Sequence, residues 1–223
     1  MRPKTLDHVA YWVADRAPLV DFVTRHLGMH VIDEQDAFTL VGSNARRGKL
    51  TFFAAEGPRE RGAIKHVALR VSDVAAARAE LPDSAADEVE VGEGVRVRLV
   101  EASTDVEYDL DHVALYARSP REAADAYAEL GFAPVANGGG APRVEVGGAY
   151  VEFHEGDPGA PERPLLNHLA VLVDSADEHA AEAENLGIVE SFVDATNTRA
   201  VFVWAPDRVR VEYVEHKPTF SLQ

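Results

Sequence analysis

The chain has 223 residues, of which 46% are apolar, and its 38 acidic and 22 basic residues give a formal net charge of −16. A negative field of this size repels phosphate backbones, which excludes nucleic acid as a partner. The absence of cysteine excludes disulfides and thiolate metal sites, and no apolar run is long enough to span a membrane. The first residues lack the apolar core of a secretory signal, so we expect a cytoplasmic protein.

A short pattern organises the chain: an apolar residue, a polar residue, His, and two more apolar residues. It occurs four times, centred on His8, His66, His112 and His168. The intervals are 58, 46 and 56 residues, and the alternate histidines are 104 and 102 residues apart. This spacing predicts four modules of about fifty residues, used as two matched pairs. The polar stretch 101–107 interrupts the periodicity, so we predict one domain over residues 1–105 and another over residues 106–223.

The first two modules predict strands around one helix each. In module one, a strand over 8–13 precedes a helix that Asp15 can cap and Gly28 ends. Strands are expected next at 29–33, 38–42 and 49–54. Module two is the shortest, with its elements expected at 66–71 (strand), 74–81 (helix), 88–91 (strand) and 95–100 (strand).

The third and fourth modules repeat this order. Ser119 and Pro120 form a helix start, and Gly131 ends that helix. The strands of module three are expected from Asp109 and at 132–135, 143–146 and 149–154. Module four has a helix over 176–186 closed by Gly187, and its strands are expected at 168–173, 188–193, 200–204 and 208–214. The modules therefore read β-α-β-β-β, which predicts an α+β fold.

Strand alternation places polar residues on the faces that point away from the helices. His112 lies on such a face of its strand, and Glu152 shares a face with His154 in the last strand of the same module. In module four, His168 and Glu212 occupy the equivalent faces. Residues 106–223 therefore present two histidines and two glutamates away from the helices.

At this point the modules resemble the vicinal oxygen chelate superfamily, which includes glyoxalase I, type I extradiol dioxygenases and bleomycin resistance proteins. The segment Ala-Pro-Asp-Arg-Val-Arg-Val-Glu-Tyr at 205–213 is similar to the closing signature of that superfamily, with Arg208 in place of its usual Gly. The resemblance implies two domains, each a cupped mixed sheet built from two βαβββ modules. It also implies a divalent metal held by four ligands of the second domain: His112, Glu152, His168 and Glu212.

The first domain departs from this pattern. It keeps His8 and His66, but Phe53 and Arg98 stand where the resemblance leads us to expect carboxylates, and neither side chain can hold a metal. Two imidazoles without a carboxylate suit oxygen-preferring ions poorly. We therefore expect a scaffold domain with structural histidines, and one divalent ion per chain: Fe²⁺, Mn²⁺, Ni²⁺ or Zn²⁺.

Three functions remain open. The four-ligand set is similar to that of glyoxalase I, which implies an isomerase or lyase acting on a small oxygenated substrate. Glu152 and Glu212 would then be catalytic carboxylates, with His154 as a nearby base. The small molecule is the expected partner, and a homodimer is compatible with this interpretation.

The first alternative is an extradiol-type dioxygenase that uses His112, His168 and Glu212 as a two-His, one-carboxylate set. Against it, Phe202 stands where the dioxygenases carry a Tyr. The second alternative is a binding protein that resembles the bleomycin resistance proteins, with no catalytic metal.

Overall fold

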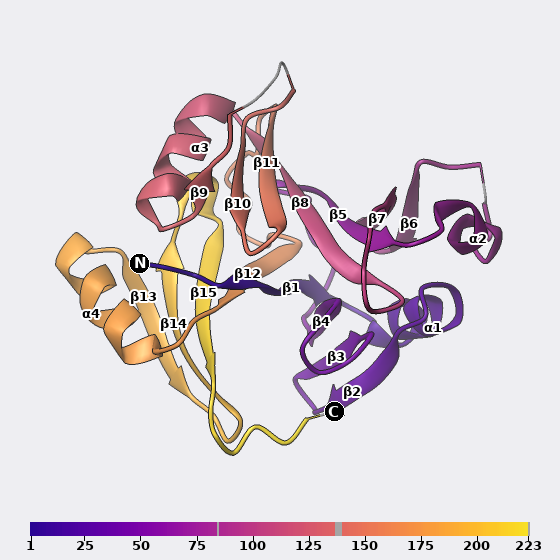
Figure 1. Ribbon diagram of the computed structural model, residues 1–223, viewed down its shortest axis with the longest axis horizontal. Coiled ribbons are helices and arrows are strands. Elements are labelled where there is room, and N and C mark those ends of the chain that lie inside the picture. The colour runs from indigo at the N-terminus through magenta and orange to yellow at the C-terminus, as the bar shows by residue number, and fades with distance from the viewer. Residues whose placement is uncertain (84, 137–139, 223) are drawn as a thin grey trace.

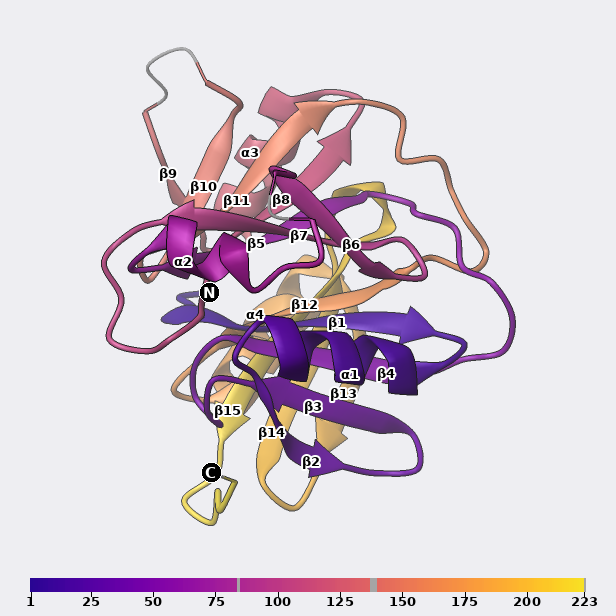
Figure 2. The same ribbon diagram turned by 90° about the vertical axis from the view of Figure 1, so that its right-hand side faces the viewer.

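In a computed structural model, residues 1–83, 85–136 and 140–222 are described. Within these ranges the strands form two mixed sheets, of eight and seven strands, flanked by four α-helices (Figure 1). Figure 2 shows the seven-stranded sheet above the eight-stranded one. The α+β fold and its repeated modules are thus confirmed.

Modules one and two follow the predicted order of elements. Module one comprises β1 (Thr5–Val13), α1 (Arg16–His26), β2 (His30–Glu34), β3 (Phe38–Gly42) and β4 (Lys49–Ala54). Module two comprises β5 (Ile64–Val71), α2 (Val74–Ala79), β6 (Glu88–Gly92) and β7 (Val95–Glu101). The Asp15 carboxylate accepts a hydrogen bond from the Ala17 amide, so it caps α1 as predicted.

Modules three and four each have a helix and four strands. Module three comprises β8 (Asp109–Ala117), α3 (Pro120–Glu129), β9 (Ala133–Pro134), β10 (Arg143–Val146) and β11 (Ala149–Glu155). Module four comprises β12 (Leu166–Leu172), α4 (Ala176–Leu186), β13 (Val189–Asp194), β14 (Thr198–Trp204), a 3₁₀ turn (Pro206–Arg208) and β15 (Arg210–His216). Gly187 ends α4 with φ of 69°, in the left-handed region that glycine adopts without strain.

The sheets join the modules in a different way from the one we predicted. The eight-stranded sheet has the order β13-β14-β15-β12-β1-β4-β3-β2, so it combines modules four and one. The seven-stranded sheet has the order β6-β7-β5-β8-β11-β10-β9 and combines modules two and three. The expectation that residues 1–105 and 106–223 each form their own cupped sheet is therefore corrected. The central pairings, β1 with β12 and β5 with β8, are antiparallel and both cross that boundary.

The helix-facing sides of the strands form the core. Tyr11 and Tyr213 are fully buried there, and the Tyr213 hydroxyl donates a 2.6 Å hydrogen bond to the carbonyl of Leu130 at the end of α3. This bond ties the last strand of module four to the helix of module three. No helix within the described ranges is long and apolar enough to cross a bilayer.

Candidate metal centre

The repeated histidines meet in pairs at the middle of each sheet. In the pairing of β1 with β12, His8 lies opposite Ala170 and His168 lies opposite Ala10, so the two side chains are diagonal neighbours. Their Nε2 atoms are 3.0 Å apart. His66 and His112 meet in the same way between β5 and β8, with 3.2 Å between their Nε2 atoms.

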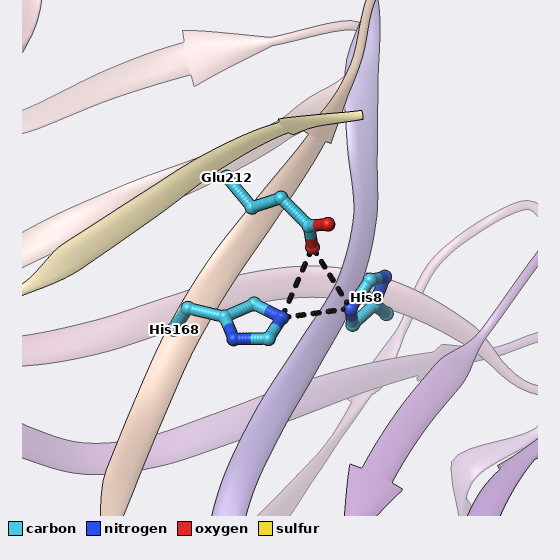
Figure 3. A group of neighbouring side chains, drawn as sticks. All are labelled: His8, His168 and Glu212. Atoms are coloured by element: carbon cyan, nitrogen blue, oxygen red, sulfur yellow. Dashed lines mark hydrogen bonds and ion pairs between the residues drawn. The ribbon is translucent and has the colours of Figure 1, made fainter. Parts of the chain in front are cut away.

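A glutamate from the last strand of a module completes each pair. Glu212 on β15 lies beside Ala170, and its Oε2 is 3.0 Å from His168 Nε2 and 3.3 Å from His8 Nε2 (Figure 3). We call these three residues the first triad. Glu152 on β11 completes the second triad, which consists of His66, His112 and Glu152. In each triad the three ligand atoms lie within 4.8 Å of one another.

A β-bulge at each repeat explains why the polar residue precedes the histidine. The strand register skips that residue in all four repeats, at positions Asp7, Lys65, Asp111 and Asn167. Adjacent strand residues normally point to opposite faces, but a bulge re-aims one of them. The extra residue can then reach its neighbouring histidine on the same face.

In three repeats the bulged residue fixes the histidine. Each His donates from Nδ1 to the preceding side chain, at 2.8 Å to Asp7, 2.7 Å to Asp111 and 3.0 Å to Asn167. With the proton held at Nδ1, the lone pair of Nε2 faces the centre of the triad. This is the arrangement in which neighbouring acceptors orient metal-bound histidines.

The repeat around His66 differs because Lys65 cannot accept a hydrogen bond. Glu88 Oε2 lies 2.8 Å from His66 Nδ1, but this nitrogen makes no hydrogen bond among the described residues. Lys65 Nζ lies 3.2 Å from His154 Nδ1, so the ammonium donates and this nitrogen must accept. His154 therefore carries its proton on Nε2 and donates it to Glu152 Oε1 at 2.7 Å.

The donors of both triads fit a divalent ion. Burial lowers the pKa of His168, and burial together with His112 lowers the pKa of His66 to about 4. Both rings are therefore neutral near pH 7, as metal binding requires. Neutral imidazole lone pairs that converge on a carboxylate oxygen repel one another unless a cation lies between them. Two nitrogen donors and one carboxylate suit Fe²⁺, Mn²⁺ or Zn²⁺.

The four predicted ligands do not form one site. His112 and Glu152 face His66, whereas His168 and Glu212 face His8 in the other sheet. The single four-ligand centre is thus corrected to two three-ligand groups, because the modules pair as one with four and two with three.

The sequence interpretation also missed two ligand candidates and misplaced one position. His8 and His66, taken as structural histidines of a scaffold, each supply one corner of a triad. Their repeat pattern was the signal that could have identified them. In module one, Thr51 pairs with Ala10 as Glu152 pairs with Ala114, so Thr51 and not Phe53 stands at the carboxylate position. The interpretation placed Arg98 correctly, since it lies opposite Ala68.

A cavity of about 690 Å³ opens onto the first triad. Its aromatic lining comes from both modules of the eight-stranded sheet: Trp12, Phe38, Phe53, Phe202 and Phe220. The Phe202 ring meets His168 edge-on, with 5.2 Å between the ring centroids. The hydroxyl of Thr51 is buried in the lining and has no hydrogen-bond partner among the described residues. The cavity thus combines aromatic side chains with polar side chains around the triad.

Comparisons with known proteins agree with this fold. Residues 5–99 match the family model described as the Glyoxalase/Bleomycin resistance protein/Dioxygenase superfamily. A candidate dioxygenase from Bacillus subtilis is similar over 98% of this chain and 87% of its own, with a TM-score of 0.79 and 15% identity. Glyoxalase I from Zea mays is similar over 95% of this chain and 92% of its own, with a TM-score of 0.73 and 15% identity.

A third solved structure, the cppA protein of Streptococcus pneumoniae, covers 96% of this chain and 98% of its own, with a TM-score of 0.63 and 12% identity. No protein with a curated description matches the sequence. At these identities the solved structures establish a shared fold.

Proposed function

Because residues 5–99 belong to the Glyoxalase/Bleomycin resistance protein/Dioxygenase superfamily and the whole chain shares the fold of glyoxalase I, we propose a divalent-metal-dependent enzyme. Its substrate is a small oxygenated molecule, and its reaction centre is the first triad. The isomerase interpretation depended on four protein ligands in one site. With three ligands there, the dioxygenase alternative becomes the better supported reaction.

The reaction that we propose is the oxygen-dependent ring cleavage of a small aromatic diol. One observation carries this proposal: a two-His, one-carboxylate triad faces a cavity with aromatic walls. A bound divalent ion would supply a Lewis acid with positions left free by the protein, as in non-haem oxygenase sites. Both atoms of O₂ enter the product of such a cleavage, so the reaction needs no external reductant.

The residues of this chain would bind and orient the diol. Phe53 and Phe202 lie within 6.0 Å and 5.2 Å of the His168 ring centroid, so they can hold an aromatic ring beside the triad. Thr51 lines the cavity at the position that a glutamate occupies in the second triad.

The test compares matched glutamate variants of the two triads. Oxygen uptake with catechol and Fe²⁺ should occur with the wild-type protein, and a ring-cleaved product should be detected by its absorbance. Glu212→Gln should abolish uptake, whereas Glu152→Gln, at the equivalent position of the other sheet, should retain it. Absence of uptake by the wild-type protein, or uptake that survives Glu212→Gln, would contradict the proposal.

The second triad supports a second candidate, the isomerase-type proton transfer predicted from the sequence. The hydrogen-bond chain from Lys65 through His154 points the Nε2–H of His154 at Glu152 Oε1, with 2.7 Å between the nitrogen and the oxygen, which suits a carboxylate that exchanges protons with a substrate. Isomerisation of a hemithioacetal without O₂ should then be lost in His154→Ala and retained in Glu212→Gln. Loss in both variants, or in neither, would reject this candidate.

A further inference from the structure

The segment that follows β15 crosses the open side of the eight-stranded sheet. We call residues 217–222 the closing segment. In Figure 1 this yellow chain leaves the foot of β15 and ends beside β2, so it passes from module four to module one. The Lys217 amide donates to the Asn197 carbonyl at 2.9 Å, and the Phe220 amide donates to the Lys217 carbonyl at 2.9 Å. The segment is therefore anchored to the turn between β13 and β14.

Two apolar side chains of the closing segment line the cavity of the first triad. Phe220 and Leu222 are both half-buried there. The Phe220 ring stacks on His216, with centroids 4.1 Å apart and planes inclined by 11°. On the module one side, the Arg46 guanidinium lies 5.3 Å from the same ring. Phe220 is thus held by groups from both modules and forms a wall of the cavity.

The same ring is connected to a ligand of the first triad. His216 Nε2 donates to Asp7 Oδ2 at 3.1 Å, and His8 Nδ1 donates to Asp7 Oδ1 at 2.8 Å. Three successive contacts therefore lead from Phe220 through His216 and Asp7 to His8. The imidazole of His216 is buried, with 8% of its side chain exposed, and the Phe220 ring stacks on it. The positions of the two rings are therefore coupled.

We propose that Phe220 is a specificity-determining residue that closes the cavity over the first triad and limits the size of the ring substituents that a diol can carry. This inference rests on the proposed function, because it concerns the substrates of the same site. Catechol is small enough to bind beneath the phenyl ring of Phe220, whereas a bulky alkyl group on the diol collides with that phenyl ring. Differences of one or a few carbon atoms in an apolar pocket change affinity by about 10-fold or more.

Binding should be measured by calorimetry without O₂ on Mn²⁺-loaded protein, with catechol and 4-tert-butylcatechol as probes. Phe220→Ala should raise the affinity for 4-tert-butylcatechol about 10-fold and lower the affinity for catechol. Leu222→Ala should change both affinities in the same directions, but by less. The matched control is Phe192→Ala, since Phe192 is an exposed phenylalanine on β13 that does not line the cavity. An unchanged ratio of the two affinities in Phe220→Ala would overturn the proposal.

A second measurement does not depend on the diol. If Phe220 covers the first triad, EDTA should remove the ion of that triad several times faster from Phe220→Ala than from the wild-type protein or from Phe192→Ala, with Glu152→Gln present in all three proteins so that the second triad holds no ion. Should the wild-type protein bind neither catechol, the proposed function fails and the chelation rate decides the inference alone. Equal rates for all three proteins would then show that Phe220 does not close the site.

Discussion

Asp7 offers a quantitative test of the polar network behind the first triad. Its carboxylate is buried and accepts a 2.8 Å hydrogen bond from the ammonium of Lys49, which is itself only 2% exposed. Burial alone would raise the pKa of Asp7, but Lys49, His216 and His8 outweigh it and hold that pKa well below its usual value. Asp7→Asn would leave the Lys49 charge buried without a counter-ion. We expect the metal-free protein to lose about 3–5 kcal/mol of unfolding free energy.

For a chain of this length, such a loss lowers Tm by roughly 6–20 °C, which calorimetry of the metal-free protein can measure. Adding Lys49→Met to Asp7→Asn removes the orphaned charge, so the double variant should recover most of the stability. Metal affinity should fall by less than about tenfold in the double variant, because the Asn oxygen can still accept from His8 as Asn167 does from His168.

The matched control for Asp7→Asn is Asp111→Asn at the equivalent position of the other sheet. Among the residues that the structure describes, Asp111 has no buried lysine partner. Arg70 lies 3.6 Å from its Oδ2, and this guanidinium also donates to two backbone carbonyls. The control should therefore cost no more than about 1–2 kcal/mol. Equal losses for the two variants would refute the argument that the buried charge of Lys49 sets the magnitude.

Three further predictions follow from the same geometry. Equilibrium dialysis should find up to two divalent ions per chain, with one lost in Glu212→Gln and the other in Glu152→Gln; loss of both ions in either variant would show that the triads are not independent. Thr51→Glu should add a fourth ligand to the first triad, raise its metal affinity about tenfold and weaken catechol binding. An unchanged metal affinity in calorimetry would show that the new carboxylate does not reach the metal. Tyr213→Phe should cost about 1–2 kcal/mol in urea unfolding because the buried carbonyl of Leu130 loses its donor; full stability would mean that water replaces the hydroxyl.

The elements of the fold could be predicted because their signals are local. Asp15 caps its helix and Gly187 ends another, since cap geometry depends on a few neighbouring residues. Ser119 stands at the predicted N-cap of α3, but its side chain makes no capping hydrogen bond. Strand bounds agree with the predicted ones to within three residues, the largest difference being the start of β1, predicted at residue 8 and observed at Thr5.

The pairing of modules could not be predicted in the same way. A repeat identifies equivalent positions, but it does not say which copies share a sheet, because strand pairing between modules is decided by tertiary packing. The error at Phe53 has a related cause. Its alignment with Glu152 is displaced by two residues from Thr51, and a shift of two keeps a side chain on the same face of a strand. Strand periodicity therefore could not reveal the mistake, whereas the hydrogen-bonded register did.

The bulge and the histidine act as one unit, and this explains why the repeat contains a polar residue. A strand without the bulge would point Asp7 or Asn167 away from the following His, and Nδ1 of that His would lose the acceptor that fixes the orientation of the ring. Lys65 is the exception that separates the two triads. It cannot accept a hydrogen bond from His66, and its ammonium contacts His154 instead, which donates to Glu152. One substitution in the repeat thus gives the two triads different hydrogen-bond partners, even though each triad consists of two His and one Glu.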